Sequence, residues 1–334
     1  LDPSGGIHSA EDADAEGVEG AFAVWEWSEL VDVLGDDIEL AAAIYGPTTN
    51  GNFEGANILH LSEKLADLAH MRGVGEEELR AAKSRIDDHL RRRRSMRVRP
   101  DRDDKVVTAW TGMALRAFAE AGAVLHREDY LSVARGIAEF LTETATVEGR
   151  LLRSWRNGRN GPSGFCDDYA AAALGLFALY QATGEEQWYR DAERFTRAMV
   201  ELFADEDGGF YATAADAEQL IARPKNTPDN PTPSDNALAA EALMTLASYT
   251  AEPELFALVE GTVRSIGPSL ATHPWAHGSL LGVWLTSAMR EVAIVGPRAD
   301  RRPLVDVVWE AFRPDTVVAQ GSGSASSVPL LEGR

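Results

Sequence analysis

Two neighbouring stretches, YAAAALGLFALY at residues 169–180 and EEQWYRDAERFTRAMVELF at residues 185–203, decide the fold of this chain. The first stretch is rich in alanine and contains no charged residue, which is typical of a helix buried on every side. In the second stretch, apolar and charged residues alternate every three to four positions, and this spacing predicts a helix with one solvated face. Together they predict a helical hairpin with a buried first member and a partly exposed second member.

The same pair of stretches recurs on both sides of this hairpin. Residues 110–126 and 129–144 repeat the pattern before it, and residues 238–249 and 253–266 repeat it after it. Three pairs of residues share one offset between the first and second hairpins: Leu115 and Leu174, Phe118 and Phe177, and Tyr130 and Tyr189. Repeated hairpins of this kind cannot bury their apolar faces alone, so they must stack side by side.

We therefore predict an all-α fold, an (α/α)6 toroid in which the alanine-rich helices form an inner ring and the charged helices an outer ring. An open solenoid is the alternative. The predicted toroid covers residues 1–290. Residues 291–320 read as a strand, a helix and a second strand, which predicts a small βαβ-like appendage packed on the toroid. Residues 321–334 are rich in glycine and serine at their start and are expected to form a flexible tail.

The composition narrows the classes of partner. Acidic residues outnumber basic ones by 53 to 32, and the formal net charge is −21. Such a charge repels nucleic acid and anionic membranes, so a neutral or cationic ligand fits better. Cys166 is the single cysteine, which rules out an internal disulfide and indicates a reducing, cytoplasmic compartment. We also find no motif for a metal or a cofactor and expect neither.

Polar residues gather immediately before the predicted inner helices. Thr108, Asp167 and Asn236 occupy equivalent positions in the repeat. Further polar residues surround them: Asp103, Asp104, Lys105, Asp168, Tyr169, Ser234 and Asp235. If the inner helices run parallel, these side chains lie at one mouth of the toroid, where helix N-termini present unpaired N–H groups. The alternative is that Thr108, Asp167 and Asn236 only cap their helices.

A mouth of this composition suits a sugar, which needs acceptors for its hydroxyls and flat aromatic faces for its C–H groups. The candidate aromatic platforms are Trp110, Trp155 and Tyr169. Glycoside chemistry commonly uses two carboxylates, so the aspartate pairs Asp167-Asp168 and Asp103-Asp104 are the best acid/base candidates. They are also ordinary helix caps and ion-pair partners. Cys166 is expected to pack in the core, because neighbouring carboxylates make its thiol a poor nucleophile.

Several segments, in this order, resemble the YyaL family, whose animal members are called spermatogenesis-associated thioredoxin-like proteins. The matching segments are Ser9–Gly17 with Glu19-Gly20; Gly51–Gly55 with Asn57–His60; Arg99–Lys105 with Thr108 and Trp110; Gly164–Ala170; Arg223–Lys225; and Thr232–Ser234. Two positions depart from the family pattern: Thr111 stands where asparagine is usual, and Asp235 where glycine is usual. The resemblance implies a thioredoxin-like domain followed by an (α/α)6 toroid related to sugar epimerases and six-hairpin glycosidases. This chain would then lack the thioredoxin-like domain and the first part of the toroid.

The resemblance also implies that Asp12, Asp14, Glu54 and His60 line the same mouth as the inner-helix residues. His60 and His277 are candidates for a proton-transferring pair of the epimerase kind, although capping or packing explains each of them as well. Two functions stay open: a carbohydrate-binding or carbohydrate-modifying toroid, and a non-catalytic scaffold that docks the thioredoxin-like domain. The first requires carboxylates gathered in one place, and the second requires an exposed apolar patch.

Overall fold

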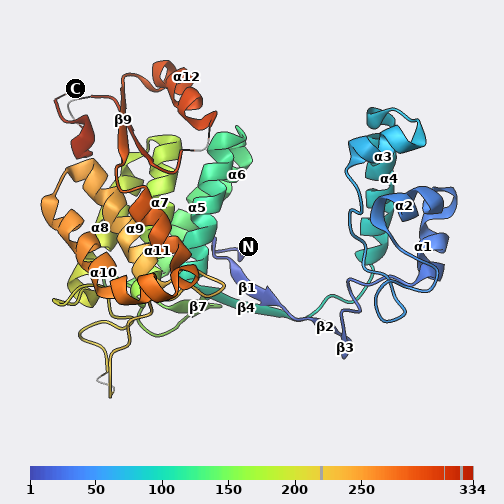
Figure 1. The fold of residues 1–334 in the computed structure, drawn as a ribbon, viewed down its shortest axis with the longest axis horizontal. Coiled ribbons are helices and arrows are strands. Elements are labelled where there is room, and N and C mark those ends of the chain that lie inside the picture. Colours follow the sequence, from blue (N-terminus) through green and yellow to red (C-terminus); the bar gives the residue numbers. More distant parts are fainter. Residues whose placement is uncertain (219–220, 312, 324–325, 334) are drawn as a thin grey trace. The chain divides into compact units, whose positions relative to one another are not determined.

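The computed structural model describes residues 1–218, 221–311, 313–323 and 326–333 (Figure 1). Contacts divide the chain into two compact units. The large unit is Leu1–Ser9 with Asp104–Arg334, and the small unit is Ala10–Asp103. Residues 10–103 therefore form a unit of their own, whereas the sequence pattern placed them in one toroid with residues 104–290.

The small unit contains four α-helices among its described residues, and they share a separate apolar core. The helices are α1 (Trp27–Leu34), α2 (Ile38–Tyr45), α3 (Leu65–Arg72) and α4 (Glu76–Arg94), with a 3-10 turn at Gly35–Asp37. Leu30 of α1 and Ile86 of α4 are buried in this core. The glycine- and asparagine-rich loop before α3 is held by Asn57, whose side chain accepts the Thr48 N–H at 2.7 Å and donates to the Thr48 carbonyl at 3.1 Å. Two short strands, β2 (Asp14–Ala15) and β3 (Val18–Glu19), form an antiparallel pair.

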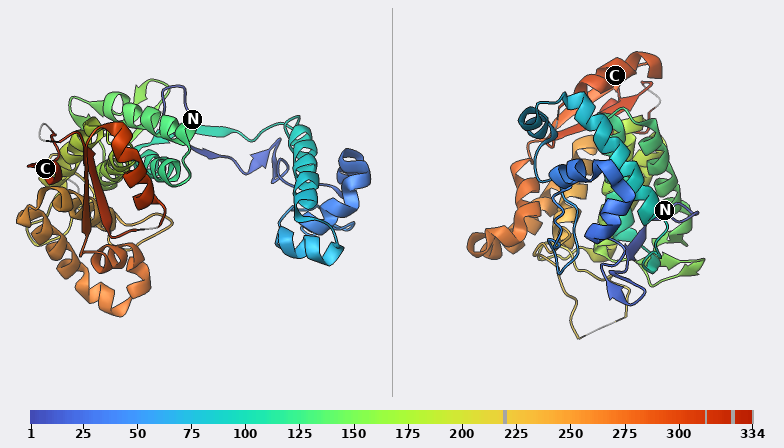
Figure 2. Two further views of the ribbon diagram at one scale, coloured as in Figure 1. Left: turned by 90° about the horizontal axis from the view of Figure 1, so that it is seen from above. Right: turned by 90° about the vertical axis from the view of Figure 1, so that its right-hand side faces the viewer.

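Helical hairpins build the large unit (Figures 1 and 2). Their first members are α5 (Thr108–Val124), α7 (Cys166–Thr183), α9 (Asp235–Thr250) and α11 (Gly278–Leu285). Their second members are α6 (Glu128–Glu139, continued by a π-helical turn at Phe140–Thr144), α8 (Glu186–Phe203) and α10 (Pro253–Thr272), and a 3-10 turn at Pro274–His277 precedes α11. This all-α architecture of the toroid type confirms the predicted fold class.

The alanine-rich helix α7 lies at the centre of the large unit because its neighbours cover it on all sides. It packs against α5, α8 and α9, and α9 in turn packs against α11. Two glycines allow the closest of these approaches: a Cβ added to Gly112 would lie 2.5 Å from the Ala171 carbonyl carbon, and one added to Gly175 would lie 2.6 Å from the Gly112 carbonyl oxygen. The lack of charge that marked residues 169–180 in the sequence therefore corresponds to full burial in the structure.

Short strands connect the helices on the side where α5 and α7 begin. One sheet has the order β1 (His8–Glu11), β4 (Arg102–Val107), β7 (Ser154–Arg156) and β8 (Arg159–Asn160). A separate hairpin joins β5 (Thr146–Val147) to β6 (Arg150–Leu151). In the first sheet, β4 pairs with β7 through Val106 opposite Trp155 and Val107 opposite Ser154. This pairing fixes the start of α5 beside the segment that leads into α7.

The expected appendage is present, and it packs on the hairpins. Strands β9 (Arg290–Val295) and β10 (Thr316–Gly321) are parallel, and helix α12 (Arg298–Trp309) connects them. This strand–helix–strand order is the one predicted for residues 291–320, of which residue 312 lies outside the described part of the chain. The hydroxyls of Tyr180 and Tyr249 donate to the carbonyls of Gln320 at 3.2 Å and Val318 at 3.1 Å, which ties the appendage to α7 and α9.

The expected flexible tail differs from what the structure describes. Val328 and Leu331 are completely buried, and a 3-10 turn spans Pro329–Leu331. The Ser327 N–H donates to Glu186 at 2.9 Å, which anchors the segment to the start of α8. The glycines and serines at the start of the tail predicted flexibility, but the apolar residues near its end, Val328 and Leu331, are buried. Residues 324–325 and 334 lie outside the described residues. Within the described chain, we find no helix with both the length and the apolar character that a membrane span requires.

Candidate functional site

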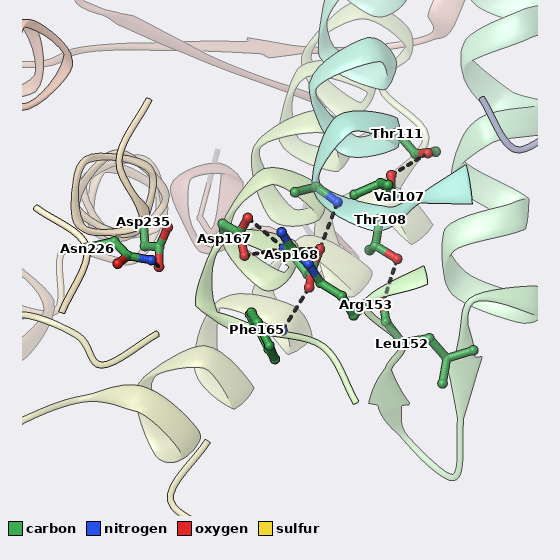
Figure 3. A network of polar contacts seen from close by, with 11 residues as sticks. Val107, Thr108, Thr111, Leu152, Arg153, Phe165, Asp167, Asp168, Asn226 and Asp235 are labelled. Carbon is green, nitrogen blue, oxygen red and sulfur yellow. Dashed lines mark hydrogen bonds and ion pairs between the residues drawn. The ribbon is translucent and has the colours of Figure 1, made fainter. Parts of the chain in front are cut away.

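Three carboxylates gather where the inner helices begin (Figure 3). Asp167 and Asp168 are the second and third residues of α7, and Asp235 is the first residue of α9. Arg153, which lies between β6 and β7, is the guanidinium that faces them. The carboxylate of Asp167 lies on the side of α7 toward Asp235 (Figure 3). We call these four side chains the helix-start cluster.

Asp168 joins the beginnings of two inner helices. Its side chain has no exposed surface, and its oxygens accept the Ala109 N–H of α5 at 2.9 Å and the Phe165 N–H before α7 at 2.8 Å. Both N–H groups belong to the first turns of helices, where the helix itself offers no acceptor. Asp168 therefore satisfies two otherwise unpaired donors and holds α5 and α7 at the same level.

Arg153 binds both members of the aspartate pair. Its Nη1 atom lies 2.6 Å and 2.7 Å from the two oxygens of Asp167 and 3.0 Å from Oδ1 of Asp168. The guanidinium also stacks over the ring of Phe165, 5.0 Å from its centroid. Arg153 was not predicted as a site residue, because arginines are frequent in this acidic chain and no motif surrounds it. Its position one residue before β7, the partner of the strand leading into α5, is the one signal that could have identified it.

One guanidinium does not neutralise three carboxylates, and burial together with the Asp167 charge raises the pKa of Asp168 and of Asp235. Burial raises the pKa of Asp168 to about 7; the charge of Asp167 adds to this, while Arg153 and the Phe165 N–H act in the opposite direction. Burial also raises the pKa of Asp235 to about 6, again with the charge of Asp167, although the Asn226 amide that donates to Asp235 at 2.8 Å partly offsets it. The cluster therefore holds a proton near neutral pH while Asp167 stays paired with Arg153.

Cys166 lies in the core beside this cluster. Burial raises the pKa of its thiol well above the ordinary value, and the nearby Asp235, Asp167 and Asp168 charges raise it further. The expected packing role agrees with its complete burial.

Asp104, the third proposed catalytic residue, does not join the helix-start cluster. Its carboxylate accepts bonds from Arg156 and from the Asn157 amide, both in the exposed β7–β8 hairpin. These two donors lower the pKa of Asp104, the Asn157 bond being the larger effect. Asp104 was predicted to join Asp167 and Asp168 because each aspartate pair lies near the start of a predicted inner helix. In the structure, β4 carries Asp104 four residues ahead of α5 and away from its first turn.

The capping alternative for Thr108, Asp167 and Asn236 is wrong. Thr108 is already helical, and its hydroxyl donates to the Leu152 carbonyl. Asn236 is buried and holds two loops, because it binds both backbone groups of Phe210 at 2.8 and 3.0 Å and the Asn226 carbonyl at 3.0 Å. Ser234 instead caps α9 by accepting the Ala237 N–H at 3.2 Å. Thr108, Ser234 and Asn236, all proposed to bind substrate, thus have structural partners.

The proposed aromatic platforms differ in their exposure. Tyr169 is fully buried, packs against Phe195 and Phe203, and accepts the Leu151 N–H at 3.0 Å, so it is a core residue. The Trp155 ring is partly buried and meets the edge of Phe140 at 5.6 Å. Trp110, in the first turn of α5, is 46% exposed and stays a candidate platform. Lys105, on β4, is also exposed.

The remaining proposed residues belong elsewhere or have other partners. Five residues expected at the mouth lie in the small unit, and their place beside the cluster stays a prediction: Asp12, Asp14, Glu54, His60 and Asp103. His277 is buried, and its ring nitrogens lie 2.7 Å from the Ser269 hydroxyl and 2.9 Å from the Thr227 carbonyl, which makes it a packing residue. Among the described residues, no group of three or more histidine, cysteine or acidic side chains is arranged to hold a metal ion.

Comparison with curated proteins finds mammalian relatives that are longer than this chain. No protein-family model matches it. It is 27% identical to the human spermatogenesis-associated protein 20 over 97% of this chain and 47% of the human protein, and 28% identical to the rat protein over 97% and 46%. The chain thus spans about half the length of the curated relatives it matches.

Solved structures that resemble the chain are helical proteins with carbohydrate-related names. They include a GH76 α-mannanase from Bacteroides thetaiotaomicron (TM-score 0.44, 15% identity, 56% of this chain and 54% of that one) and a cellobiose 2-epimerase from Spirochaeta thermophila (0.40, 21%, 50% and 44%). A third is an inactive variant of an α-1,6-mannanase from Salegentibacter in complex with α-1,6-mannotriose (0.40, 16%, 73% and 70%).

Proposed function

We propose that the large unit binds and modifies a carbohydrate at the helix-start cluster by acid/base chemistry. The observation that carries this proposal is the gathering of Asp167 and Asp235 at the starts of two neighbouring inner helices, with Arg153 bound to Asp167. Asp167 is held beside Arg153 at 2.6–2.7 Å, while Asp235 has a pKa raised to about 6 by burial and by the Asp167 charge. Two carboxylates near one sugar, one of them with a raised pKa, are the groups that glycosidases use.

The burial of each residue suggests its role. Asp167 is the proposed base or nucleophile, because its side chain keeps 19% of its surface exposed. Asp235 is the proposed acid, since it can release a proton near neutral pH. Asp168 is fully buried and is proposed as a positioning residue that holds Arg153 and two helix starts. The resembling family usually has glycine in place of Asp235, so this assignment of the acid concerns this chain.

A sugar-library thermal-shift screen tests the proposal. The library includes cellobiose and α-1,6-mannotriose, the sugars named for two of the similar structures. We expect at least one sugar to stabilise the longer parent protein, and Asp167→Asn and Asp235→Asn to abolish turnover while the folded state is retained. Asp104→Asn is the matched control, since its carboxylate lies outside the cluster, and it should leave both measurements unchanged. Failure of every sugar to stabilise the parent contradicts a carbohydrate role.

A docking role is the second candidate, favoured by exposed apolar residues at the end of α11. Trp284 is 43% exposed and Leu285 is 81% exposed. We further infer, from the resemblance to the YyaL family, that a thioredoxin-like domain accompanies this unit in a cytoplasmic parent. Replacing Leu285 by Asp would then weaken the association of that domain with the large unit, measured on separately produced parts, while sugar binding is unaffected.

A further inference from the structure

The large unit contains a concave site that is separate from the helix-start cluster. A cavity of about 570 Å³ is enclosed by α5, α7, α9, α11 and the appendage elements α12 and β10. We call it the inner cavity. Its volume falls in the range of roughly 300–1,000 Å³ that is typical of small-molecule sites. Neither the proposed acid/base chemistry nor any predicted site residue uses it.

The wall of the inner cavity is mainly apolar. Leu174 and Phe177 of α7, Leu238 and Met244 of α9, and Val283 of α11 line it. Water gains few hydrogen bonds against such a wall, so an apolar ligand body that replaces it is favoured.

Three charged side chains, Arg116, Glu120 and Glu241, lie together on this otherwise apolar wall. Arg116 of α5 donates through Nε to Glu120 and through Nη1 to Glu241 of α9, each at 2.8 Å. The pair with Glu241 joins α5 to α9 across the face of α7 that lies between them. Arg116 keeps 39% of its side-chain surface accessible, and Glu120 and Glu241 keep 42% and 33%. All three line the inner cavity, so this accessible surface is available to a ligand.

The charges of this group do not balance. Two carboxylates face one guanidinium, which leaves an excess negative charge beside an apolar wall. Burial opposes the positive charge of Arg116, but the Glu241 and Glu120 charges outweigh it and keep its pKa above the ordinary value. Arg313, at the appendage end, is a further cation on the lining, but it is exposed to water and donates to the Val308 carbonyl at 3.2 Å. The excess charge favours a cationic ligand group and disfavours a carboxylate or phosphate.

We propose that the inner cavity is a binding site for a small molecule with an apolar body and one protonated amine, the amine pairing with Glu120 and Glu241 beside Arg116. The apolar body packs against Leu174, Phe177 and Val283. The site needs no turnover at the helix-start cluster, so its test is independent of the proposed function.

Three probes that share one chain length and differ in their head group separate charge from apolar contact. Isothermal titration calorimetry of the 334-residue chain with n-octylammonium, n-octanol and octanoate should give binding in that order of affinity. We expect n-octylammonium to bind about tenfold more tightly than octanoate. Equal affinity for octanoate, or no binding of n-octylammonium, would overturn the proposal.

Variants locate the binding. Glu241→Gln should weaken n-octylammonium about fivefold and leave n-octanol unchanged; Glu120→Gln is the substitute if Glu241→Gln lowers the melting temperature. Gly282 of α11 lines the cavity, and a Cβ placed there meets no atom within 4 Å, so Gly282→Phe can occupy the space without a backbone change. This variant should abolish binding of all three probes while the melting temperature is maintained.

The matched control is Glu260→Gln on α10, an exposed glutamate away from the cavity. It should not alter any of the affinities. If Glu260→Gln weakens n-octylammonium as much as Glu241→Gln does, the amine binds the acidic surface in general and the inner cavity is not its site. Persistent binding by Gly282→Phe leads to the same conclusion.

Discussion

The dipeptide Asp-Asp occurs twice near the start of an inner helix, on β4 before α5 and in the first turn of α7, and the two copies have opposite environments. Asp168 is buried, shares Arg153 with Asp167 and has a pKa raised to about 7 by burial and the neighbouring charge. Asp104 lies on β4, is paired with Arg156 and Asn157 of the exposed β7–β8 hairpin, and has its pKa lowered. The difference teaches that the number of carboxylates per guanidinium, together with burial, decides whether an aspartate stores a proton or only forms an ion pair.

The largest expected effect on the free energy of unfolding comes from removing the Asp168 carboxylate, and the comparison is removal of the Asp104 carboxylate. Asp168→Ala leaves Arg153 without one partner and leaves the Ala109 and Phe165 N–H groups unpaired, so we expect the free energy of unfolding to fall by about 3–5 kcal/mol. Asp104→Ala should leave it essentially unchanged, because its partners remain solvated. Urea denaturation of both variants, followed by circular dichroism, measures the difference. Equal losses would contradict the contrast between the two pairs.

A smaller effect is expected when the guanidinium of each pair is removed. Arg153→Gln takes away the one cation that faces three carboxylates, and at pH 8 we expect a loss of about 2 kcal/mol, reduced from the value of a fully buried pair because Arg153 is 29% exposed. Arg156→Gln is the matched control, since its side chain is 60% exposed, and should have little effect. If the loss from Arg153→Gln is as large at pH 5 as at pH 8, excess carboxylate charge is not its cause.

The smallest expected effect is on the pH dependence of stability. Asp235 has a folded-state pKa raised from 3.8 to about 6, so the folded state binds more protons than the unfolded state between these values. Its contribution is therefore fully present below about pH 4 and is lost as pH rises toward 6, while Asp168 extends the loss to about 7. Asp235→Asn should reduce this loss of stability between about pH 4 and pH 6 by about 1 kcal/mol. The figure is smaller than the whole pKa difference implies, because water reaches the carboxylate.

The pKa of Asp104 is shifted in the opposite direction from that of Asp235, so its effect on the pH dependence of stability has the opposite sign. Its lowered pKa means that its contribution is present above the unfolded value of 3.8 and is lost only as pH falls further. Asp104→Asn should therefore change the profile only on the acid side. Denaturation series from pH 3 to pH 8 distinguish the two variants, and a steeper decline in Asp235→Asn would show that the sign assigned to Asp235 is wrong.

Periodicity in the sequence predicted the hairpins because burial leaves a direct trace in composition. The charge-free run at residues 169–180 is buried along α7, and the alternating run after it forms α8 with one solvated face. The repeat register also placed Asp167 and Asp235 near helix starts that come together. These features depend on local residue patterns, which a sequence contains in full.

The sequence by itself determined the helical class, the order of the hairpins and the existence of a βαβ appendage. Only the tertiary structure decided that Arg153 binds both Asp167 and Asp168, that Asp104 does not join them, that Tyr169 and His277 are packing residues, and that Val328 and Leu331 are buried. The physical reason is that helix formation follows from the spacing of neighbouring residues, whereas protonation, burial of a tail and access to a ligand depend on groups far apart in the chain.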